Sequence, residues 1–381
     1  MRLTMSSFRT ARMILYGLLL SAAAGAIHAQ SPDTQQQTAT PTPPAPVWSI
    51  GPIDFSGLVD GYYSFNFNHP ADRYNDLYNF DVRSQQFSLN MAKLSLSHNP
   101  DPVGFQIDLG FGRAFDLVHA NEQAPEIFRY LEQAYLSLKP ARLKGLEIDF
   151  GQFTSSAGAE VIETMNNFNY SRSLLFALAV PYYHFGLRTS MPVGKHFTAG
   201  VQLVNGWNDI EDNNSGKTVG LNGAVTFGKW SLAENYYGGP EHTNTNRGWR
   251  HLSDTVLTLT PNSRVSAYLN YDYGRDKNIG PGAVHWSGIA GAARFQATSR
   301  LAFSPRVEYF DDHNGFMTGA AQKVKEATFT GEYKWVEGLM SRLEYRRDWS
   351  DQRFFTAGYG GLSKDQSTLT LALLGYFGPK R

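Results

Sequence analysis

The sequence contains no cysteine, and only 18% of its 381 residues are charged. Without cysteine the chain can form no disulfide and can carry no lipid on an N-terminal cysteine. A soluble domain has about 25% charged residues, so this deficit indicates a large surface on which charge is unfavourable. Beyond the N-terminal region, no segment approaches the roughly 20 consecutive apolar residues of a transmembrane helix. The chain can therefore enter a membrane only as a closed sheet, in which all backbone polar groups are paired.

Motifs for catalysis or metal binding are also missing. The ten histidines are scattered without an HExxH pattern, and there is no nucleophile elbow or phosphate-binding glycine loop. A run of oxygen-bearing side chains does not have the spacing of a calcium loop, and it favours a solvated loop; these residues are Asp209, Glu211, Asp212, Asn213 and Asn214. We expect no cofactor, no metal and no enzymatic activity. The 34 basic and 34 acidic residues give no argument for nucleic-acid binding.

The N-terminus has the features of a secretory signal peptide. Arg2, Arg9 and Arg12 precede an apolar stretch that is too short to span a bilayer, and Ile27-His28-Ala29 resembles a small-residue cleavage site. We therefore expect three regions: a signal peptide at residues 1–29, cleaved after Ala29; a disordered Pro/Thr/Gln-rich leader at residues 30–50; and one barrel domain at residues 51–381. The leader has too little apolar surface to offset the entropy of ordering it.

Alternating apolar and polar residues recur along the rest of the chain. The clearest segments cover residues 103–112, 197–203, 218–227, 265–274, 326–335 and 367–377. Each is close to the roughly 10 residues that cross a bilayer as a tilted strand. With the weaker segments, the pattern predicts about sixteen strands, within a range of roughly 14–18. The alternation slips by one residue near Met91, and Pro305 interrupts a strand, so we expect a β-bulge at each place.

The connections between these strands alternate between short turns and long polar loops. Asn99 to Pro102 and Pro192 to Lys195 are short turns, whereas residues 69–86, 154–180 and 238–250 are long connections. This asymmetry is typical of short periplasmic turns and long extracellular loops. The predicted fold is an all-β transmembrane antiparallel up-and-down β-barrel. A soluble two-domain β protein is the alternative that the alternation alone leaves open.

The width of the predicted barrel indicates which face lies inside. About sixteen strands enclose a space too wide for wall side chains to fill, so the inner wall must tolerate water. We expect the ionisable face to line the lumen and the apolar face to contact lipid. The predicted lumen residues on the strands are Asp60, Asp108, Glu147, Asp149, Arg188, Arg306, Glu308, Glu332, Lys334, Arg342, Glu344 and Arg346.

The longest connection, residues 154–180, is the candidate constriction. Loops of this length are often functional, and we expect this one to fold into the lumen with its acidic side chains facing basic wall residues. The constriction would contain Glu160, Glu163 and Arg172 from the loop, with Arg188, Arg306, Arg342 and Arg346 from the wall. The alternatives are an outer cap with Leu174, Leu175 and Phe176 packed on the rim, and wall charges that only form an ion-pair ladder. The mixed signs argue against a strong anion or cation preference.

Several runs of the sequence resemble a known family. They are FSGLVDGYYSFNFNHP, FSLNMAKLSLSHNPDPVGFQIDLGFG, EQAYLSLKP, GLEIDFGQFTSSAGAEVIE, NYSRSLLFALAVPYYHFGLR and NYYGG. These runs resemble the outer-membrane beta-barrel porins of the OmpL-like group, and the similarity extends over residues 55–377. The resemblance implies a porin-type pore in the outer membrane of a Gram-negative bacterium. Many barrels end on an aromatic residue, whereas here four residues follow Phe377.

The expected function is passive diffusion of small hydrophilic solutes through a water-filled lumen with a mixed-charge constriction. Two alternatives remain open: a plugged structural or adhesive barrel, and a barrel that carries an enzyme active site. The expected partners are outer-membrane lipid, small hydrophilic solutes or ions, and the barrel-assembly machinery during biogenesis. The sequence does not decide whether the barrels assemble as a homotrimer.

Overall fold

The computed structural model describes residues 48–143, 145–277 and 282–378. The predicted signal peptide, its cleavage site after Ala29 and most of the predicted leader lie outside the described residues. Within the described part of the chain, the helices are too short or too polar to span a bilayer.

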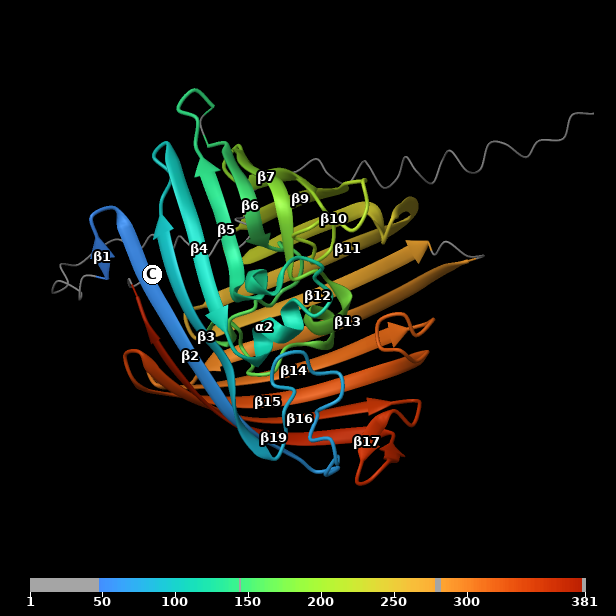
Figure 1. Ribbon diagram of the computed structural model, residues 1–381. Helices are drawn as coiled ribbons and strands as arrows, with labels where there is room; N and C mark the ends of the chain where they lie inside the picture. The colour runs from blue at the N-terminus through green and yellow to red at the C-terminus, as the bar shows by residue number, and fades with distance from the viewer. Residues whose placement is uncertain (1–47, 144, 278–281, 379–381) are drawn as a thin grey trace, which may run out of the picture.

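Sixteen antiparallel strands form one closed sheet, as the alternation predicted. Each strand pairs with the next along the chain, and the last strand pairs with the first, so that Leu371 lies opposite Tyr63 (Figure 1). The strands are β2 (Ile53–Asn66), β3 (Gln86–His98), β4 (Val103–Phe111), β5 (Leu131–Leu138), β6 (Glu147–Thr154), β7 (Tyr183–Val193), β8 (Phe197–Val204), β9 (Thr218–Phe227), β10 (Trp230–His242), β11 (Thr245–Asn262), β12 (Val265–Lys277), β13 (Ala283–Gln296), β14 (Leu301–Asp312), β15 (Gln322–Val336), β16 (Leu339–Ser350) and β19 (Asp365–Phe377).

The remaining elements are short and lie outside the ladder of the barrel. A two-residue strand, β1 (Ser49–Ile50), pairs with the beginning of β2. A small hairpin made of β17 (Phe355–Ala357) and β18 (Gly361–Ser363) occupies the last long loop. The helices are α2 (Arg113–Val118), η1 (Glu126–Tyr130), η2 (Thr164–Asn166) and η3 (Leu175–Ala179).

Three local predictions have different outcomes. The bulge near Met91 is confirmed, because the partners of β2 jump from Met91 to Leu89 and leave Asn90 out of the pairing. The bulge at Pro305 is wrong: the ladder between β13 and β14 has a gap there but keeps its register on both sides. Residues 238–250 are not a long loop, because β10 and β11 continue through them to a tight turn at Asn244, whose φ is 61°. Their Gly, Pro and Asn residues resemble loop composition but lie in paired strands.

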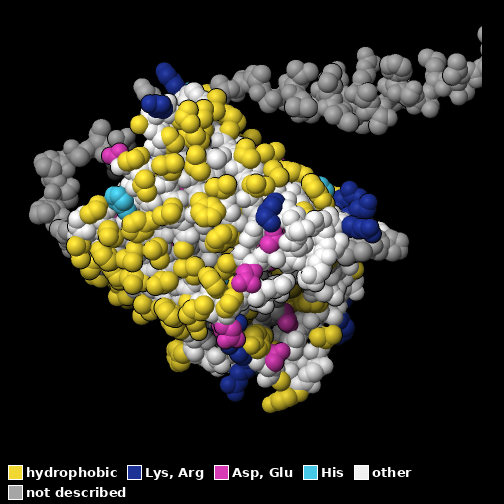
Figure 2. All heavy atoms as spheres, turned by 45° about the horizontal axis from the view of Figure 1, so that its top comes forward, with side chains coloured by type: hydrophobic (Ala, Val, Ile, Leu, Met, Phe, Trp, Pro, Cys, Tyr) yellow, Lys and Arg dark blue, Asp and Glu magenta, His cyan; other side chains and the backbone are white. Residues whose placement is uncertain are grey.

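The two faces of the wall have opposite character. On β19, Leu371 points outward and is 57% exposed, whereas its neighbour Thr370 points inward and is 2% exposed. The same alternation on β16 places Leu343 outside and Glu344 inside. Figure 2 shows hydrophobic side chains covering a broad field of the outer wall. An apolar outer belt is the surface that a hydrocarbon environment requires.

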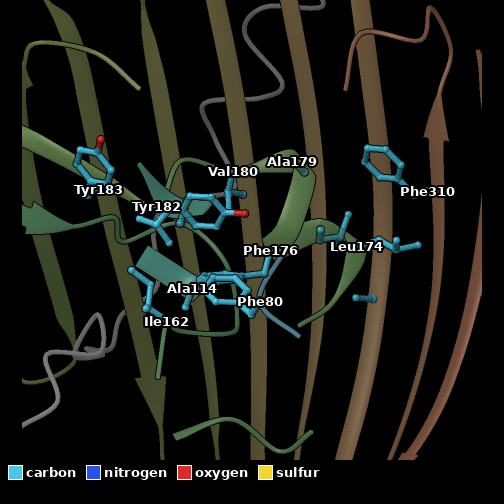
Figure 3. Close-up of a cluster of buried hydrophobic side chains, with 14 of the residues drawn as sticks. Phe80, Ala114, Ile162, Leu174, Phe176, Ala179, Val180, Tyr182, Tyr183 and Phe310 are labelled. Atoms are coloured by element: carbon cyan, nitrogen blue, oxygen red, sulfur yellow. The ribbon is translucent and has the colours of Figure 1, made fainter. Parts of the chain in front are cut away.

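The hydrophobic core of the molecule lies inside the barrel. Segments from the long loops enter the lumen and bury apolar side chains there, among them Phe80, Phe115, Phe176 and Tyr182 (Figure 3). The rings of Phe80 and Phe176 stack with centroids 6.0 Å apart, and Tyr182 contacts both rings. A barrel of this width leaves room for such inserted chain.

An arginine on the outer belt should destabilise the barrel according to its depth. Leu371→Arg places a charge near the middle of the belt, and we expect it to lower the free energy of unfolding by about 2–4 kcal/mol. Val336→Arg, beside a periplasmic turn, should cost about 0–1 kcal/mol, because the side chain reaches water there. Denaturant unfolding in lipid vesicles measures both values. Equal losses for the two variants would contradict the assignment of the outer face to lipid.

Candidate functional site

The connection between β6 and β7 crosses the lumen. We call residues 155–182 the inserted loop. Its Ser156 Oγ donates to Asn235 Oδ1 on β10 at 2.8 Å, and its Tyr170 hydroxyl donates to Asp60 Oδ1 on β2 at 2.8 Å. Because the loop contacts strands on different sides of the barrel, it cannot lie on the outer rim. The expectation that this loop enters the barrel therefore agrees with the geometry.

Apolar side chains of the inserted loop pack inside the barrel and not on its rim. Leu174 and Leu175 are fully buried, and Phe176 is 5% exposed. Leu175 lies against Gly288 of β13 so closely that a Cβ atom at that position would be 2.4 Å from the leucine side chain. A larger residue at position 288 would therefore push the loop away from the wall.

Arg342 on β16 holds the first part of the inserted loop by its backbone. Its Nη1 atom donates to the carbonyl oxygens of Thr164 and Asn169 at 2.7 and 2.9 Å, and its Nη2 atom donates to the carbonyl oxygen of Asn167 at 2.8 Å. Glu332 on β15 balances its charge at 2.7 Å. The guanidinium group has several fixed donors, so one side chain can fix three backbone positions.

Two further arginines hold the next part of the loop. Arg306 on β14 donates to the carbonyl oxygen of Ser171 at 2.7 Å and pairs with Glu160 of the loop at 2.9 Å. Arg346 on β16 donates to the carbonyl oxygen of Arg172 at 2.7 Å. We refer to Arg306, Arg342 and Arg346 as the arginine clamp. All three side chains are at most 1% exposed.

Glu344 complements the arginine clamp by accepting from backbone N–H groups. Its carboxylate accepts from the amides of Tyr170 and Ser171 at 2.6 and 2.9 Å, and from the hydroxyl of Thr330 at 2.7 Å. It lies between Arg342 and Arg346 on the inward face of β16. Along β16, Arg342 donates to backbone carbonyl groups of the loop, Glu344 accepts from the next backbone N–H groups, and Arg346 donates to the carbonyl group that follows them.

Arg172 does not face open lumen. It is 2% exposed and donates to the carbonyl oxygens of Tyr170 and Ile162 and to the Thr164 hydroxyl. Its guanidinium group also lies 4.4 Å from the centre of the Phe80 ring. Arg172 therefore closes the inserted loop on itself and fixes it against the segment that follows β2.

The other predicted residues are divided between two sides of the lumen. Glu308 lies 3.1 Å from Arg306, beside the clamp. Arg188 is not near Glu160 or Glu163; it pairs with Asp149 at 2.7 Å on the far wall, because its position on β7 directs it there. Glu163 does not meet an arginine and pairs with Lys93, which also contacts Asp108. Both acidic side chains therefore lie beside cationic wall residues, Glu160 beside Arg306 and Glu163 beside Lys93.

Sequence reasoning missed Lys93 and Glu132, which together with Asp108 and Glu163 make a compact charged cluster. Lys93 follows the bulge at Asn90, which reverses the inward and outward positions of β3. A second register shift lies beside Asp108 opposite β5, near Glu132. The slip in the alternation near Met91 was the available signal in the sequence. If the inward and outward positions are exchanged after this slip, Lys93 is predicted to face inward.

Solvent exposure varies along and around the inner wall. Inward side chains near the extracellular end are almost fully buried by inserted segments, as at His184, Tyr237 and Trp286. Other inward side chains remain half-buried and partly in contact with solvent, and we call one set of them the half-buried sector. These side chains are Gln106, Tyr135, Arg188, Asn222 and Ala233, on β4, β5, β7, β9 and β10.

Acidic side chains gather in the extracellular loop that joins β8 and β9. Burial, together with the nearby negative charges of Glu241 and Glu122, raises the pKa of Asp209 from its ordinary value of 3.8 to about 8. Asp209 is 5% exposed, and its Oδ2 atom accepts from Asn213 Nδ2 at 2.8 Å. The carboxyl group is therefore protonated at neutral pH, so the folded loop buries a neutral group at this position and not a negative charge.

Glu344→Gln should loosen the hold of β16 on the inserted loop. The amide keeps only one acceptor oxygen, so one of the two backbone N–H groups loses its partner at a cost of about 1–3 kcal/mol. We expect faster hydrogen exchange at Tyr170 and Ser171, measured by mass spectrometry on peptides from this segment. Glu337→Gln, in an exposed periplasmic turn, is the control and should leave these amides unchanged. Unaltered exchange in Glu344→Gln would show that the carboxylate does not hold the loop.

The loop around Asp209 should lose stability at alkaline pH. Because the folded loop raises the pKa, its stability relative to the unfolded chain falls as pH rises from the ordinary value through about 8. We expect increased proteolytic cleavage of residues 205–217 between pH about 7 and about 9. Asp209→Asn has no charge to gain and should resist cleavage at both pH values, whereas Glu211→Gln in the same loop should behave as wild type. A pH-independent wild type would disprove the assignment.

Comparison with known proteins agrees with this architecture. The family model described as "Putative beta-barrel porin-2, OmpL-like" matches residues 52–377. The OmpT of Vibrio cholerae in its trimer form is similar in structure, with a TM-score of 0.56, 13% identity, and coverage of 85% of this chain and 99% of that chain. The outer membrane channel DcaP of Acinetobacter baumannii gives a TM-score of 0.58, 13% identity, and coverage of 85% and 97%.

An anion-selective porin from Comamonas acidovorans is also similar, with a TM-score of 0.55, 10% identity, and coverage of 85% of this chain and 99% of that chain. At these identities, the structural likeness concerns the fold. No protein of curated function matches the sequence. The family match extends over nearly all of the barrel, and this chain therefore belongs to the OmpL-like family of outer-membrane beta-barrel porins.

Proposed function

We propose that this porin is a passive diffusion channel for small hydrophilic solutes and that the inserted loop forms its constriction. The observation that carries the proposal is the one-sided attachment of the loop. Charged side chains on β14, β16, β2 and β3 hold it through the arginine clamp, Glu344, Asp60 and Lys93. On the opposite side its contacts join neutral groups, such as Ser156 with Asn235 and with Tyr237.

The half-buried sector of the inner wall marks the proposed solute path. Arg188 is the charged group in this sector, and its side chain is 25% exposed beside the buried carboxylate of Asp149. Gln106 on β4 and Asn222 on β9 add neutral polar groups to this sector. Solutes that form hydrogen bonds could replace their hydration at such a wall, whereas apolar solutes could not. The clamp arginines would not contact solute, because the loop backbone already occupies their donors.

A plugged structural or adhesive barrel is the second candidate. It is favoured by the apolar cluster inside the barrel, where Phe80, Phe176 and Tyr182 bury their rings (Figure 3). An interior of this kind would stop solutes unless a path remains beside it. The two candidates differ in one measurable property, which is the current that the protein carries across a bilayer.

Other features of the proposal concern biogenesis and assembly. We propose export with cleavage after Ala29, insertion of residues 51–381 as one barrel by the barrel-assembly machinery, and a function without enzymatic catalysis. We also propose assembly as a homotrimer in the outer membrane. The trimer form of the similar Vibrio cholerae OmpT supports this assembly.

Planar-bilayer recordings with the refolded protein test the channel directly. We expect ohmic current steps from the wild type. The double variant Arg342→Gln/Arg346→Gln should raise the step conductance by roughly twofold, because the loop loses its charged attachment and widens the constriction.

Arg347→Gln is the matched control for this experiment. Arg347 lies on the same strand but faces outward, where it pairs with Asp365. Its substitution should leave the conductance unchanged. A wild type without current steps would support the plugged barrel, and an unchanged conductance in the double variant would show that the loop is not the constriction.

A further inference from the structure

Lys93 is surrounded by three carboxylates on the inner wall and the inserted loop. Its Nζ atom lies 3.0 Å from Asp108 Oδ2 on β4 and 2.9 Å from Glu132 Oε2 on β5. It also pairs with Glu163 of the inserted loop. One oxygen of each carboxylate lies within 4.8 Å of the others, so the cluster is compact.

The charges in this cluster do not balance. Three carboxylates face a single ammonium group, which leaves a surplus of negative charge in a nearly dry place. Asp108 is partly compensated by the side-chain amides of Gln106 and Gln133 at 2.5 and 2.6 Å. Glu132 has no comparable amide partner. It is 1% exposed, and among the described residues its carboxylate forms only the ion pair with Lys93, since neither carboxylate oxygen accepts a hydrogen bond. Buried polar groups are nearly always paired, so this carboxylate indicates a position for another donor.

The geometry of the cluster fits an ammonium group. Separations of 2.9 and 3.0 Å between nitrogen and oxygen are typical of a charged hydrogen bond. A bound calcium or magnesium ion would require oxygen atoms at about 2.0–2.6 Å. Lys93 therefore shows that these three carboxylates can hold an ammonium group.

The cluster is in contact with the lumen. The Glu163 side chain is 19% exposed, and it belongs to the loop that crosses the barrel. Lys93, Asp108 and Glu132 lie behind it on three consecutive strands. A cation that moves along the lumen would meet Glu163, the member of the cluster that is exposed.

We propose that Asp108, Glu132 and Glu163 form a binding site for the primary ammonium group of a cationic solute. Lys93 occupies one ammonium position, and the surplus negative charge attracts a second cation to Glu132 and Glu163. This inference rests on the proposed function as a diffusion channel, and it names the class of solute that the constriction favours. The arginine clamp does not oppose it, because its positive charges are neutralised by carboxylates and backbone carbonyls.

Ion selectivity tests the site in the working channel. With the full-length protein in a bilayer under a KCl gradient, we expect a reversal potential on the cation-selective side. Millimolar n-propylammonium should reduce the potassium current. Glu132→Gln and Glu163→Gln should each lower the ratio of cation to anion permeability by roughly threefold and weaken the block. Glu126→Gln, whose side chain is 92% exposed and does not belong to the cluster, is the control and should change neither value.

A binding measurement tests the same site without any current. Lys93→Ala removes three methylene groups and the ammonium group. The space that they leave has the size and shape of n-propylammonium. We expect calorimetry on the refolded variant in detergent to show saturable n-propylammonium binding. Adding Glu132→Gln should weaken this binding by about tenfold. n-Propanol, which has the same chain without the charge, should not bind, and magnesium chloride should not compete.

The outcomes separate this inference from the proposed function. Current steps without cation preference, or unchanged by Glu132→Gln and Glu163→Gln, would overturn the inference and leave the diffusion channel intact. Absence of current would remove the diffusion channel, and calorimetry would then decide whether the ammonium site exists. Saturable binding that requires Glu132 would support the site. Absence of binding, or preference for magnesium over n-propylammonium, would overturn it.

Discussion

The structure depends on one geometric constraint: a closed sheet of sixteen strands encloses more space than its own side chains can fill. In this porin a large part of that space is occupied by chain from the loops. Inserted chain brings backbone N–H and C=O groups into a nearly dry interior, where each needs a partner. The wall supplies these partners through Arg306, Arg342, Arg346 and Glu344. The charged residues of the wall are therefore largely the means by which the loop is held.

Burying the charges of the arginine clamp is tolerable because each guanidinium group has partners. A buried ion without one costs several kcal/mol, whereas hydrogen bonds and an opposite charge can offset that cost. Arg342 meets Glu332 and three carbonyl groups, and Arg306 meets Glu160 and the Ser171 carbonyl. Lys93 differs, because its three carboxylates exceed its single charge. The lumen thus contains one neutralised region that gives rigidity and one acidic region that remains able to attract cations.

The sequence predicted the barrel and its faces well, because the alternation of residues is a direct consequence of strand geometry. It also led us to expect that the loop enters the lumen with its acidic side chains facing basic wall residues, and the structure places Glu160 beside Arg306. It could not predict that Glu344 accepts two backbone amides, since backbone partners leave no pattern in the side chains. Lys93 and Glu132 were missed because register shifts beside Asn90 and Asp108 change which side chains face inward. Residues 238–250 have the composition of a loop, yet pairing between β10 and β11 overrides it.

The pairing of the first and last strands has a consequence for the order of folding. The hydroxyl of Thr370 contacts that of Ser64, although the two residues are 306 positions apart in the chain. The cylinder cannot be sealed until its final strand has been delivered to the membrane. The loop between β6 and β7 is held by strands that lie far along the chain, since Arg306 is 135 positions from Ser171, whose carbonyl oxygen it binds. Contacts between residues so far apart in the chain make assembly of this protein a non-local and therefore slow event.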